Sequence, residues 1–167
     1  MTGVRYTGIP SEEELKNSPG LPTAERMAQG RVACVECVQE IPCNPCESIC
    51  RFGAITVGEQ ITSLPVLHGE KCTGCGLCVA NCPGLAITIL DQNYSETQAT
   101  IDFPFEYLPL PKEGDTVEAV GRDGMTVCPG TIVKVTKINA YAGTAVIRMA
   151  IPKEHIMTVR SMKRIKR

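Results

Sequence analysis

The chain has 167 residues, a net charge of −1 and a hydrophobic fraction of 43%, with 4% aromatic residues and no Trp. This length fits one domain or two small ones, and the charge balance gives no basic field of the kind that nucleic-acid binding needs. The sequence has no apolar run near the roughly 18 residues of a membrane helix, so we expect no membrane span. Because aromatic residues are few, we expect bound metal to stabilise part of the fold.

Ten Cys are present, and a secreted disulfide scaffold is one explanation for that number. The N-terminus has no basic segment followed by an apolar one, so we expect no secretory signal. Together with C-x₂-C spacing, this predicts metal ligation in a reducing, cytoplasmic and anaerobic setting.

Residues 1–30 contain several Pro and Gly and predict an extended N-terminal arm. Ser11 precedes three Glu, which predicts the N-cap of a short helix with acidic residues in its first turn. Two interpretations of the arm stay open, a loosely ordered terminus and a segment laid on a partner subunit. The length of the arm favours the second.

The strongest signal is a run of four cysteines and a proline with the spacing C-x₂-C-x₂-C-x₃-C-P: Cys72, Cys75, Cys78, Cys82 and Pro83. The run resembles the ligand motif that bacterial ferredoxins use for a [4Fe–4S] cluster. Gly74 and Gly76 lie between the ligands, where small residues let the backbone approach the sulfurs. A zinc site is the alternative, but zinc usually takes Cys as separated pairs.

An internal repeat surrounds this run within residues 31–92, which hold nine of the ten Cys. A shift of 32 residues superposes Cys43, Cys46 and Cys50 on Cys75, Cys78 and Cys82, and 54–56 on 86–88. Each repeat is expected to form a ligand loop, a short helical turn and a strand, with the strands at 54–57 and 86–90.

Residues 31–92 therefore resemble a bacterial-type two-cluster ferredoxin domain. In that family the fourth Cys of each motif ligates the cluster of the other motif. The resemblance implies that one [4Fe–4S] cluster, here called cluster one, is held by Cys72, Cys75, Cys78 and Cys50. It implies that the second, cluster two, is held by Cys43, Cys46, Cys82 and one further residue.

That further ligand is where the sequence departs from the family pattern, because Glu40 occupies the position that matches Cys72. Cys37 is the first candidate, with a longer loop returning the chain to Cys43. Cys34 is the second. Glu40 is the third, because a carboxylate suits a soft iron–sulfur centre poorly. A three-iron cluster, or none, in this half is the remaining alternative.

Residues 93–113 are expected to form a linker, in which 99–105 is an extended edge segment because Pro104 excludes a central strand. Residues 114–167 predict a small β domain with a basic tail at 160–167. Its expected strands are 116–120, 131–138 and 144–151, separated by turns at 121–124, 128–130 and 139–143. The predicted fold class is thus α+β, a ferredoxin-like two-cluster domain followed by an all-β, barrel-like domain.

The basic tail admits two interpretations, docking to nucleic acid or an acidic partner, and a solvated tail. The absence of interleaved aromatic residues favours the solvated tail. Cys128 is isolated in a predicted turn, and nothing ties it to a base such as His68 or His155, so we expect no catalytic residue.

Paired iron–sulfur clusters carry single electrons, so the sequence predicts an electron-transfer subunit that is not catalytic alone. A second resemblance is carried by residues 34–46 and covers mainly residues 31–92. It is to the small iron–sulfur subunits of bacterial flavin-dependent amine and amino-acid dehydrogenase complexes, including proline-, hydroxyproline- and opine-oxidising systems. It implies FAD- or FMN-containing dehydrogenase partners in a hetero-oligomer. The alternatives are a stand-alone soluble ferredoxin, and a redox-sensing interaction protein whose β domain binds nucleic acid.

Overall fold

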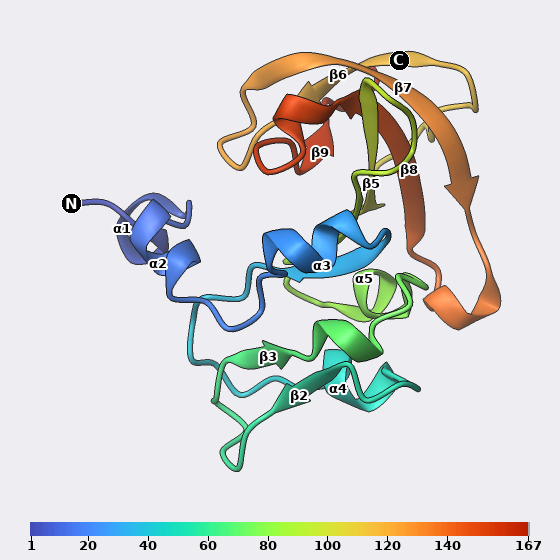
Figure 1. The fold of residues 1–167 in the computed structure, drawn as a ribbon. Helices are drawn as coiled ribbons and strands as arrows, with labels where there is room; N and C mark the ends of the chain where they lie inside the picture. Colours follow the sequence, from blue (N-terminus) through green and yellow to red (C-terminus); the bar gives the residue numbers. More distant parts are fainter. Residues whose placement is uncertain (167) are drawn as a thin grey trace.

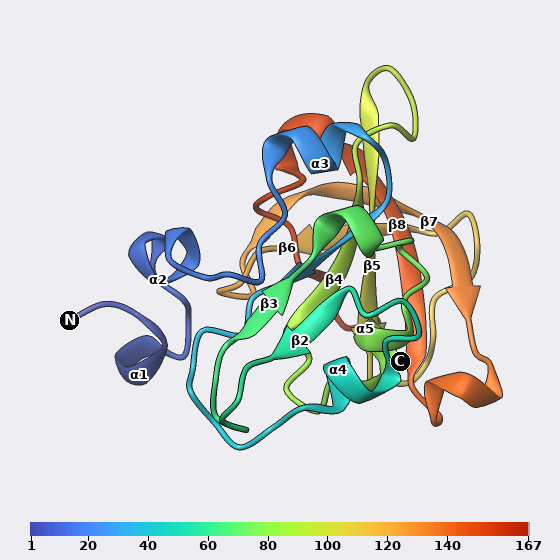
Figure 2. The same cartoon turned by 60° about the horizontal axis from the view of Figure 1, so that its bottom comes forward.

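A computed structural model describes residues 1–166 as a mixed helix and strand fold built on one large antiparallel sheet (Figure 1). In spatial order its seven strands are β1 (Val32–Val35), β4 (Ile87–Asp91), β5 (Gln98–Phe105), β8 (Ala145–Pro152), β7 (Thr126–Thr136), β6 (Thr116–Val120) and β9 (Ser161–Met162). A separate hairpin pairs β2 (Ile55–Val57) with β3 (Pro65–Leu67). Figure 2 shows this hairpin in front of the large sheet, beside the two central helices of the cysteine-rich half.

The helices are short: α1 (Val4–Thr7), α2 (Glu12–Lys16), α3 (Ala24–Ala28), α4 (Pro45–Ile49), α5 (Leu77–Asn81), and the 3₁₀ turns Gly69–Lys71, Asn139–Tyr141 and Lys153–His155. The expected N-cap is confirmed at α2. The Ser11 hydroxyl accepts from the Glu14 amide at 3.2 Å, and the Glu14 carboxylate accepts from the Ser11 amide at 2.7 Å. This reciprocal capping orders the N-terminal arm locally. No helix among residues 1–166 has the length and apolar character that crossing a bilayer requires.

The internal repeat is confirmed in the fold. Each unit has a five-residue helix that carries the second of its three superposed cysteines, Cys46 or Cys78, and a strand that follows it. These are α4 and β2 in the first unit and α5 and β4 in the second. β1, which precedes both units, pairs antiparallel with β4, from Val32 opposite Leu90 to Val35 opposite Ile87.

Side chains of β1 alternate between two hydrophobic cores because successive residues of a strand point to opposite faces. Ala33 and Val35 pack with Ile87 into the core that also holds buried cysteines of the two motifs. Val32 and Cys34 face the other way, into the core beneath the C-terminal strands. All four residues of β1 are buried, so the strand separates the two cores.

The expectation of an edge segment at 99–105 is wrong, because these residues belong to β5. It lies inside the sheet, paired with β4 on one side and β8 on the other. Pro104 is tolerated because β4 reaches only residues 100–102 of β5, so no strand lies on one side of the proline. The sheet therefore runs without a break from the cysteine-rich half into the C-terminal half, while the division into separate domains stays a prediction.

The C-terminal strands are confirmed with one error, since the expected turn at 128–130 lies within β7. Pro129 and Gly130 pair with Glu118 and Val117 of β6, and β8 pairs with β7 only from Thr131 onward. Pro129 thus has a strand on one side only, as Pro104 has. The sheet curls enough for β9 to contact β5, but among the described residues β9 pairs only with β6. A closed barrel stays a prediction.

The basic tail is not simply solvated. Arg160 forms an ion pair with buried Glu36, Lys163 pairs with Glu118, and the Arg164 guanidinium lies 5.6 Å from the ring centroid of Tyr107. The solvated-tail expectation is wrong for Arg160, whose side chain is 10% exposed, whereas Lys163 and Arg164 are exposed to solvent as expected. Arg167 lies outside the described residues.

Candidate iron–sulfur site

Four cysteines from both repeat units line one small cavity: Cys50, Cys72, Cys75 and Cys78. Cys50 follows α4, Cys72 follows a 3₁₀ turn, and Cys78 lies on α5, so the two units meet at this point. The remaining walls are mainly apolar, with Ala33 and Ile55 among them. A small apolar chamber with four convergent thiols suits a [4Fe–4S] cube.

The electrostatics of this cavity also fit a metal cluster. Burial raises the pKa of the Cys78 thiol, and the neighbouring Cys72, Cys75 and Cys50 raise it further because their thiolates would repel one another. Such a set is costly to deprotonate without a cation, and iron binding supplies that cation.

Four further cysteines of the repeat region affect one another electrostatically: Cys37, Cys43, Cys46 and Cys82. Burial raises the pKa of Cys46 to about 11, followed by the effects of Cys82, Cys43 and Cys37. Burial also raises the pKa of Cys37, with Cys82 and Cys43 adding to it. Cys37 and Cys82 also pack against the core that holds Cys46.

Cys37 differs in its surroundings from the other two candidates for the fourth ligand, Cys34 and Glu40. Cys34 faces the opposite core from Cys46, as the alternation along β1 requires, and its Sγ lies 3.8 Å from the Glu36 carboxylate. Burial raises the pKa of Cys34 to about 11. Glu40 is exposed to solvent. Of the three candidates, Cys37 is the one that packs against the core holding Cys46, and its role as a ligand stays a prediction.

Backbone amides point at the sulfurs. The amides of Ala54 and Ala86, four residues after Cys50 and Cys82, donate to those sulfurs at 3.3 and 3.5 Å. A third bond, at 3.3 Å, runs from the Ala33 amide to the Cys72 sulfur. Bonds of this kind stabilise negative charge on a ligand sulfur.

Three side chains bond to the backbone of residues 72–75, the loop that carries two ligands of cluster one. Arg26 donates to the Cys72 carbonyl at 2.7 Å, and Arg31 donates to the Gly74 carbonyl at 2.8 Å. The Tyr141 hydroxyl donates to the Cys75 carbonyl at 3.2 Å. Sequence reasoning missed these three residues because no spacing rule connects them with the motif.

Gly74 explains why this loop tolerates no larger residue. Its φ is +66°, a conformation that favours glycine, and an added Cβ would lie 2.6 Å from the Arg31 Cβ. The sequence-based expectation of a small residue at this position thus has a steric cause outside the motif itself.

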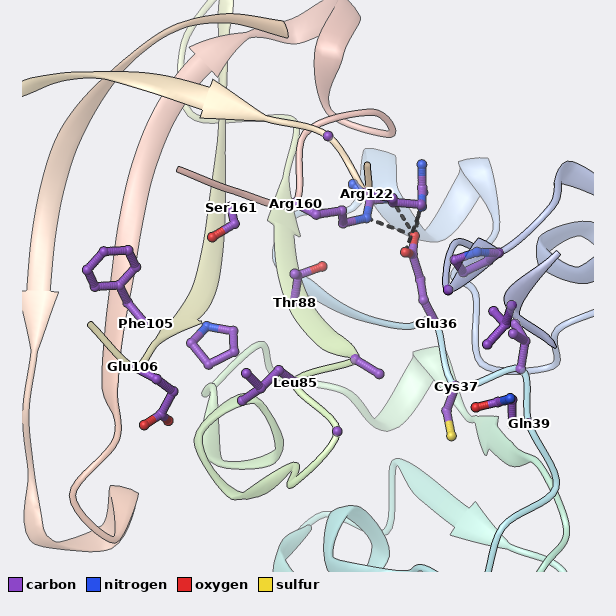
Figure 3. A pocket seen from close by; sticks show the side chains of 18 of the residues that line it. Glu36, Cys37, Gln39, Leu85, Thr88, Phe105, Glu106, Arg122, Arg160 and Ser161 are labelled. Carbon is purple, nitrogen blue, oxygen red and sulfur yellow. Dashed lines mark hydrogen bonds and ion pairs between the residues drawn. The ribbon is translucent and has the colours of Figure 1, made fainter. Parts of the chain in front are cut away.

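A second, larger cavity of about 550 Å³ opens between the cysteine-rich half and the C-terminal strands (Figure 3). Cys37 and Leu85 lie on its wall toward the cysteines, and Phe105 lies on the sheet side. Thr88 is buried, and its hydroxyl has no hydrogen-bond partner among the described residues. The cavity has the size of a small-molecule or cofactor site, and it lies beside a candidate cluster ligand.

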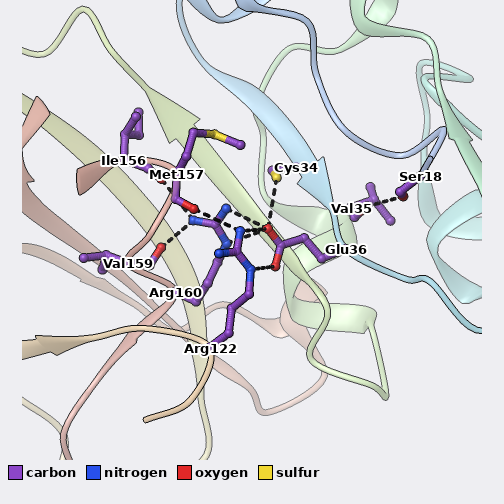
Figure 4. A network of polar contacts seen from close by, with 9 residues as sticks. All are labelled: Ser18, Cys34, Val35, Glu36, Arg122, Ile156, Met157, Val159 and Arg160. Carbon is purple, nitrogen blue, oxygen red and sulfur yellow. Dashed lines mark hydrogen bonds and ion pairs between the residues drawn. The ribbon is translucent and has the colours of Figure 1, made fainter. Parts of the chain in front are cut away.

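A buried ion network forms one wall of this cavity (Figure 4). The Glu36 carboxylate accepts from Arg122 Nε at 2.8 Å and from Arg160 Nε at 2.8 Å. Burial alone would raise the pKa of Glu36, but the Arg122 and Arg160 guanidiniums lower it overall. The network therefore links Glu36, the residue before Cys37, to Arg122 and Arg160 of the C-terminal half.

The remaining candidates gain no role. Cys128 is buried within β7, and His68 contacts Thr56, 2.9 Å from its hydroxyl. Within residues 1–166 no three His, Cys, Asp or Glu side chains are gathered as around one metal ion, which does not favour a zinc site. A cube differs from zinc in that each thiolate binds its own iron.

The family described as 4Fe-4S binding domain matches residues 65–88, which contain Cys72, Cys75, Cys78 and Cys82. The chain carries an iron–sulfur ferredoxin domain. This confirms [4Fe–4S] binding, and the presence of a second cluster stays a prediction. No solved structure matches the chain significantly.

Relatives resemble parts of the chain. Protein Pixie of Drosophila melanogaster is 32% identical over 96 residues, 53% of this chain and 15% of its own length. One component of the Na(+)-translocating ferredoxin:NAD(+) oxidoreductase complex of Acetobacterium woodii is 43% identical over 47 residues, 28% of this chain and 14% of its own length. The ferredoxin-type protein NapF of Haemophilus influenzae is 34% identical over 67 residues, 39% of this chain and 38% of its own length. The chain thus spans well under half of these relatives.

Proposed function

We propose that the chain is the electron-transfer subunit of an oxidoreductase complex and holds two [4Fe–4S] clusters. The observation that carries the proposal is the cavity that Cys50, Cys72, Cys75 and Cys78 line together, with Cys37 and Cys82 packed against the core that holds Cys46. Cluster one takes Cys50, Cys72, Cys75 and Cys78. Cluster two takes Cys37, Cys43, Cys46 and Cys82, with Cys37 as the ligand that the sequence pattern left open.

A [4Fe–4S] cluster, once bound, accepts and releases one electron without making or breaking bonds to a substrate. The chain's own contribution is to bury the ligands and to direct amides at them. Ala33, Ala54 and Ala86 supply those amides. No side chain in this arrangement is given a catalytic role, so substrate oxidation belongs to a partner.

The proposed partner is a flavin-containing dehydrogenase that oxidises an amine or amino acid. Two relatives, from Acetobacterium woodii and Methanosarcina acetivorans, are components of oxidoreductase complexes by name, which supports a hetero-oligomeric role for this chain. The cavity beside Cys37 offers a partner's redox group an approach to cluster two. The N-terminal arm, which lines the same cavity through Val4 and Pro10, would complete the contact.

The cluster assignment is tested by counting iron and sulfide in anaerobically purified protein. Two clusters give about eight iron atoms per chain, and Cys37→Ser is expected to reduce this to about four. Cys34→Ser is the matched control, a neighbouring thiol on the opposite face of β1, and it should retain about eight. Equal iron in wild type and Cys37→Ser, or loss in Cys34→Ser, would refute the assignment.

The partner is tested by purifying a tagged chain expressed together with its neighbouring genes. Co-purification of a subunit with bound FAD or FMN, identified by its extracted absorbance spectrum, is expected. A chain that elutes alone with its clusters intact would contradict the flavoprotein complex and favour a stand-alone carrier.

A further inference from the structure

Arg26 of α3 is bonded to the backbone around cluster one. Its guanidinium donates to the carbonyls of Gly69 at 2.7 Å, Arg31 at 2.9 Å and Cys72 at 2.7 Å, and also to that of Gly30 at 3.1 Å. All four acceptors are neutral carbonyls. Arg26 is half-buried, and its bond to the Cys72 carbonyl fixes the guanidinium beside a ligand of cluster one. No carboxylate among residues 1–166 forms an ion pair with this charge.

A second positive charge lies on the same loop. Arg31 donates to the Gly74 carbonyl at 2.8 Å and pairs with buried Asp102 at 2.7 Å. Arg148 pairs with the same carboxylate at 2.8 Å. Two guanidiniums share the Asp102 carboxylate, so these three side chains together carry a net charge of +1. Arg26 adds a further positive charge beside cluster one.

Cluster two has different surroundings. Residues 37–49, which bring three of its four candidate ligands, contain Glu40 and Glu47 and no Lys or Arg. The nearby Arg122 and Arg160 are committed to Glu36 and to backbone carbonyls of the C-terminal half. Of the three amide-to-sulfur bonds, two fall on ligands of cluster one, Cys50 and Cys72, and one on Cys82 of cluster two.

These differences act in one direction. Reduction adds one negative charge to a cluster, and nearby cations and amide donors stabilise that charge. We infer that cluster one has the higher reduction potential of the two and that Arg26 is the positioning residue chiefly responsible. The inference rests on the proposed two-cluster function and adds a direction to it.

The direction follows from where each cluster meets the surface. Cys37 of cluster two lines the large cavity, whereas Cys75 of cluster one is exposed, next to the half-exposed Phe52. A two-electron donor at the cavity would lose its electrons one at a time to cluster two. Each electron would move on to cluster one, and a one-electron acceptor would be reduced at the Cys75 face.

The test is an anaerobic titration with dithionite as the electron donor, followed by EPR. Arg26→Gln removes the charge and is expected to lower the equilibrium constant of the first reduction step about tenfold, which is ~59 mV for one electron. Arg26→Lys keeps the charge and should restore most of that difference. Arg5→Gln removes an equivalent charge from exposed α1 and should leave both steps unchanged.

Cys37→Ser assigns the steps without altering Arg26. This variant retains cluster one only, and its single step should coincide with the higher-potential step of the wild type. The inference is overturned if that step coincides with the lower one, or if Arg26→Gln with full iron content titrates like the wild type. If Arg26→Gln loses iron, the Cys37→Ser titration decides. A wild type with about four iron atoms would instead refute the two-cluster function.

Discussion

Replacing Glu36 with Gln removes the negative charge that Arg122 and Arg160 share. The side chains of Glu36 and Arg160 are 9% and 10% exposed, and that of Arg122 is 19% exposed, so solvent can do little to replace the lost charge. Gln keeps the shape and can still accept one hydrogen bond. The variant therefore places two guanidiniums in a buried site with no counter-charge.

The magnitude follows from the cost of an uncompensated buried charge. Removing one partner of a buried pair typically costs 3–5 kcal/mol, and because Gln retains one acceptor we expect about 3 kcal/mol here. In a chain of this size 1 kcal/mol corresponds to roughly 2–4 °C in the unfolding midpoint, so the expected decrease is about 6–12 °C.

The assay is anaerobic thermal unfolding followed by far-ultraviolet circular dichroism. Iron is lost on unfolding, so the transition is irreversible, and all variants must be scanned at one rate. Glu118→Gln is the matched control, because Glu118 pairs with Lys163 at an exposed position. Its midpoint should stay close to that of the wild type. A Glu36→Gln midpoint no lower than that of Glu118→Gln would refute the reasoning.

Two further predictions concern single positions. Gly74→Ala places a Cβ 2.6 Å from the Arg31 Cβ at a φ of +66°, so the iron content should fall to about four atoms per chain. The control is Gly114→Ala, which has a φ of +91° and open space around it and should keep about eight iron atoms. Cys34 has a pKa of about 11, so at pH 8 only about one thiol in a thousand is a thiolate. Iodoacetamide should therefore leave Cys34 unmodified in the folded protein and label it after denaturation, and mass spectrometry measures both. Rapid labelling in the folded state would contradict its burial.

The sequence was sufficient for the features that depend on local spacing. The 32-residue repeat, the helical turn and strand of each unit, and the Ser11 cap all follow from short-range patterns, and the structure has them. The choice between Cys34 and Cys37 was not local. It depends on residues 32–35 forming a strand, and on the alternation of that strand between two cores.

The errors share one physical origin. Pro104 and Pro129 were assigned to an edge segment and a turn because proline cannot donate to a sheet. Both lie in strands at points where the neighbouring strand on one side is absent, which depends on strand lengths elsewhere in the chain. The loop-holding role of Arg26 was missed for a related reason, since its acceptors are backbone carbonyls that any sequence supplies.

The unbroken sheet has a consequence for how the molecule opens. β5 shares its hydrogen bonds between β4, which follows the second cysteine motif, and β8, which belongs to the C-terminal half. Amides on both sides of β5 therefore belong to one cooperative unit of hydrogen exchange. Loss of iron from the clusters should therefore increase deuterium uptake in β8, a strand that carries no cysteine ligand but packs through Val146 into the core that holds Cys46 and Cys78. The C-terminal strands would then report cluster occupancy.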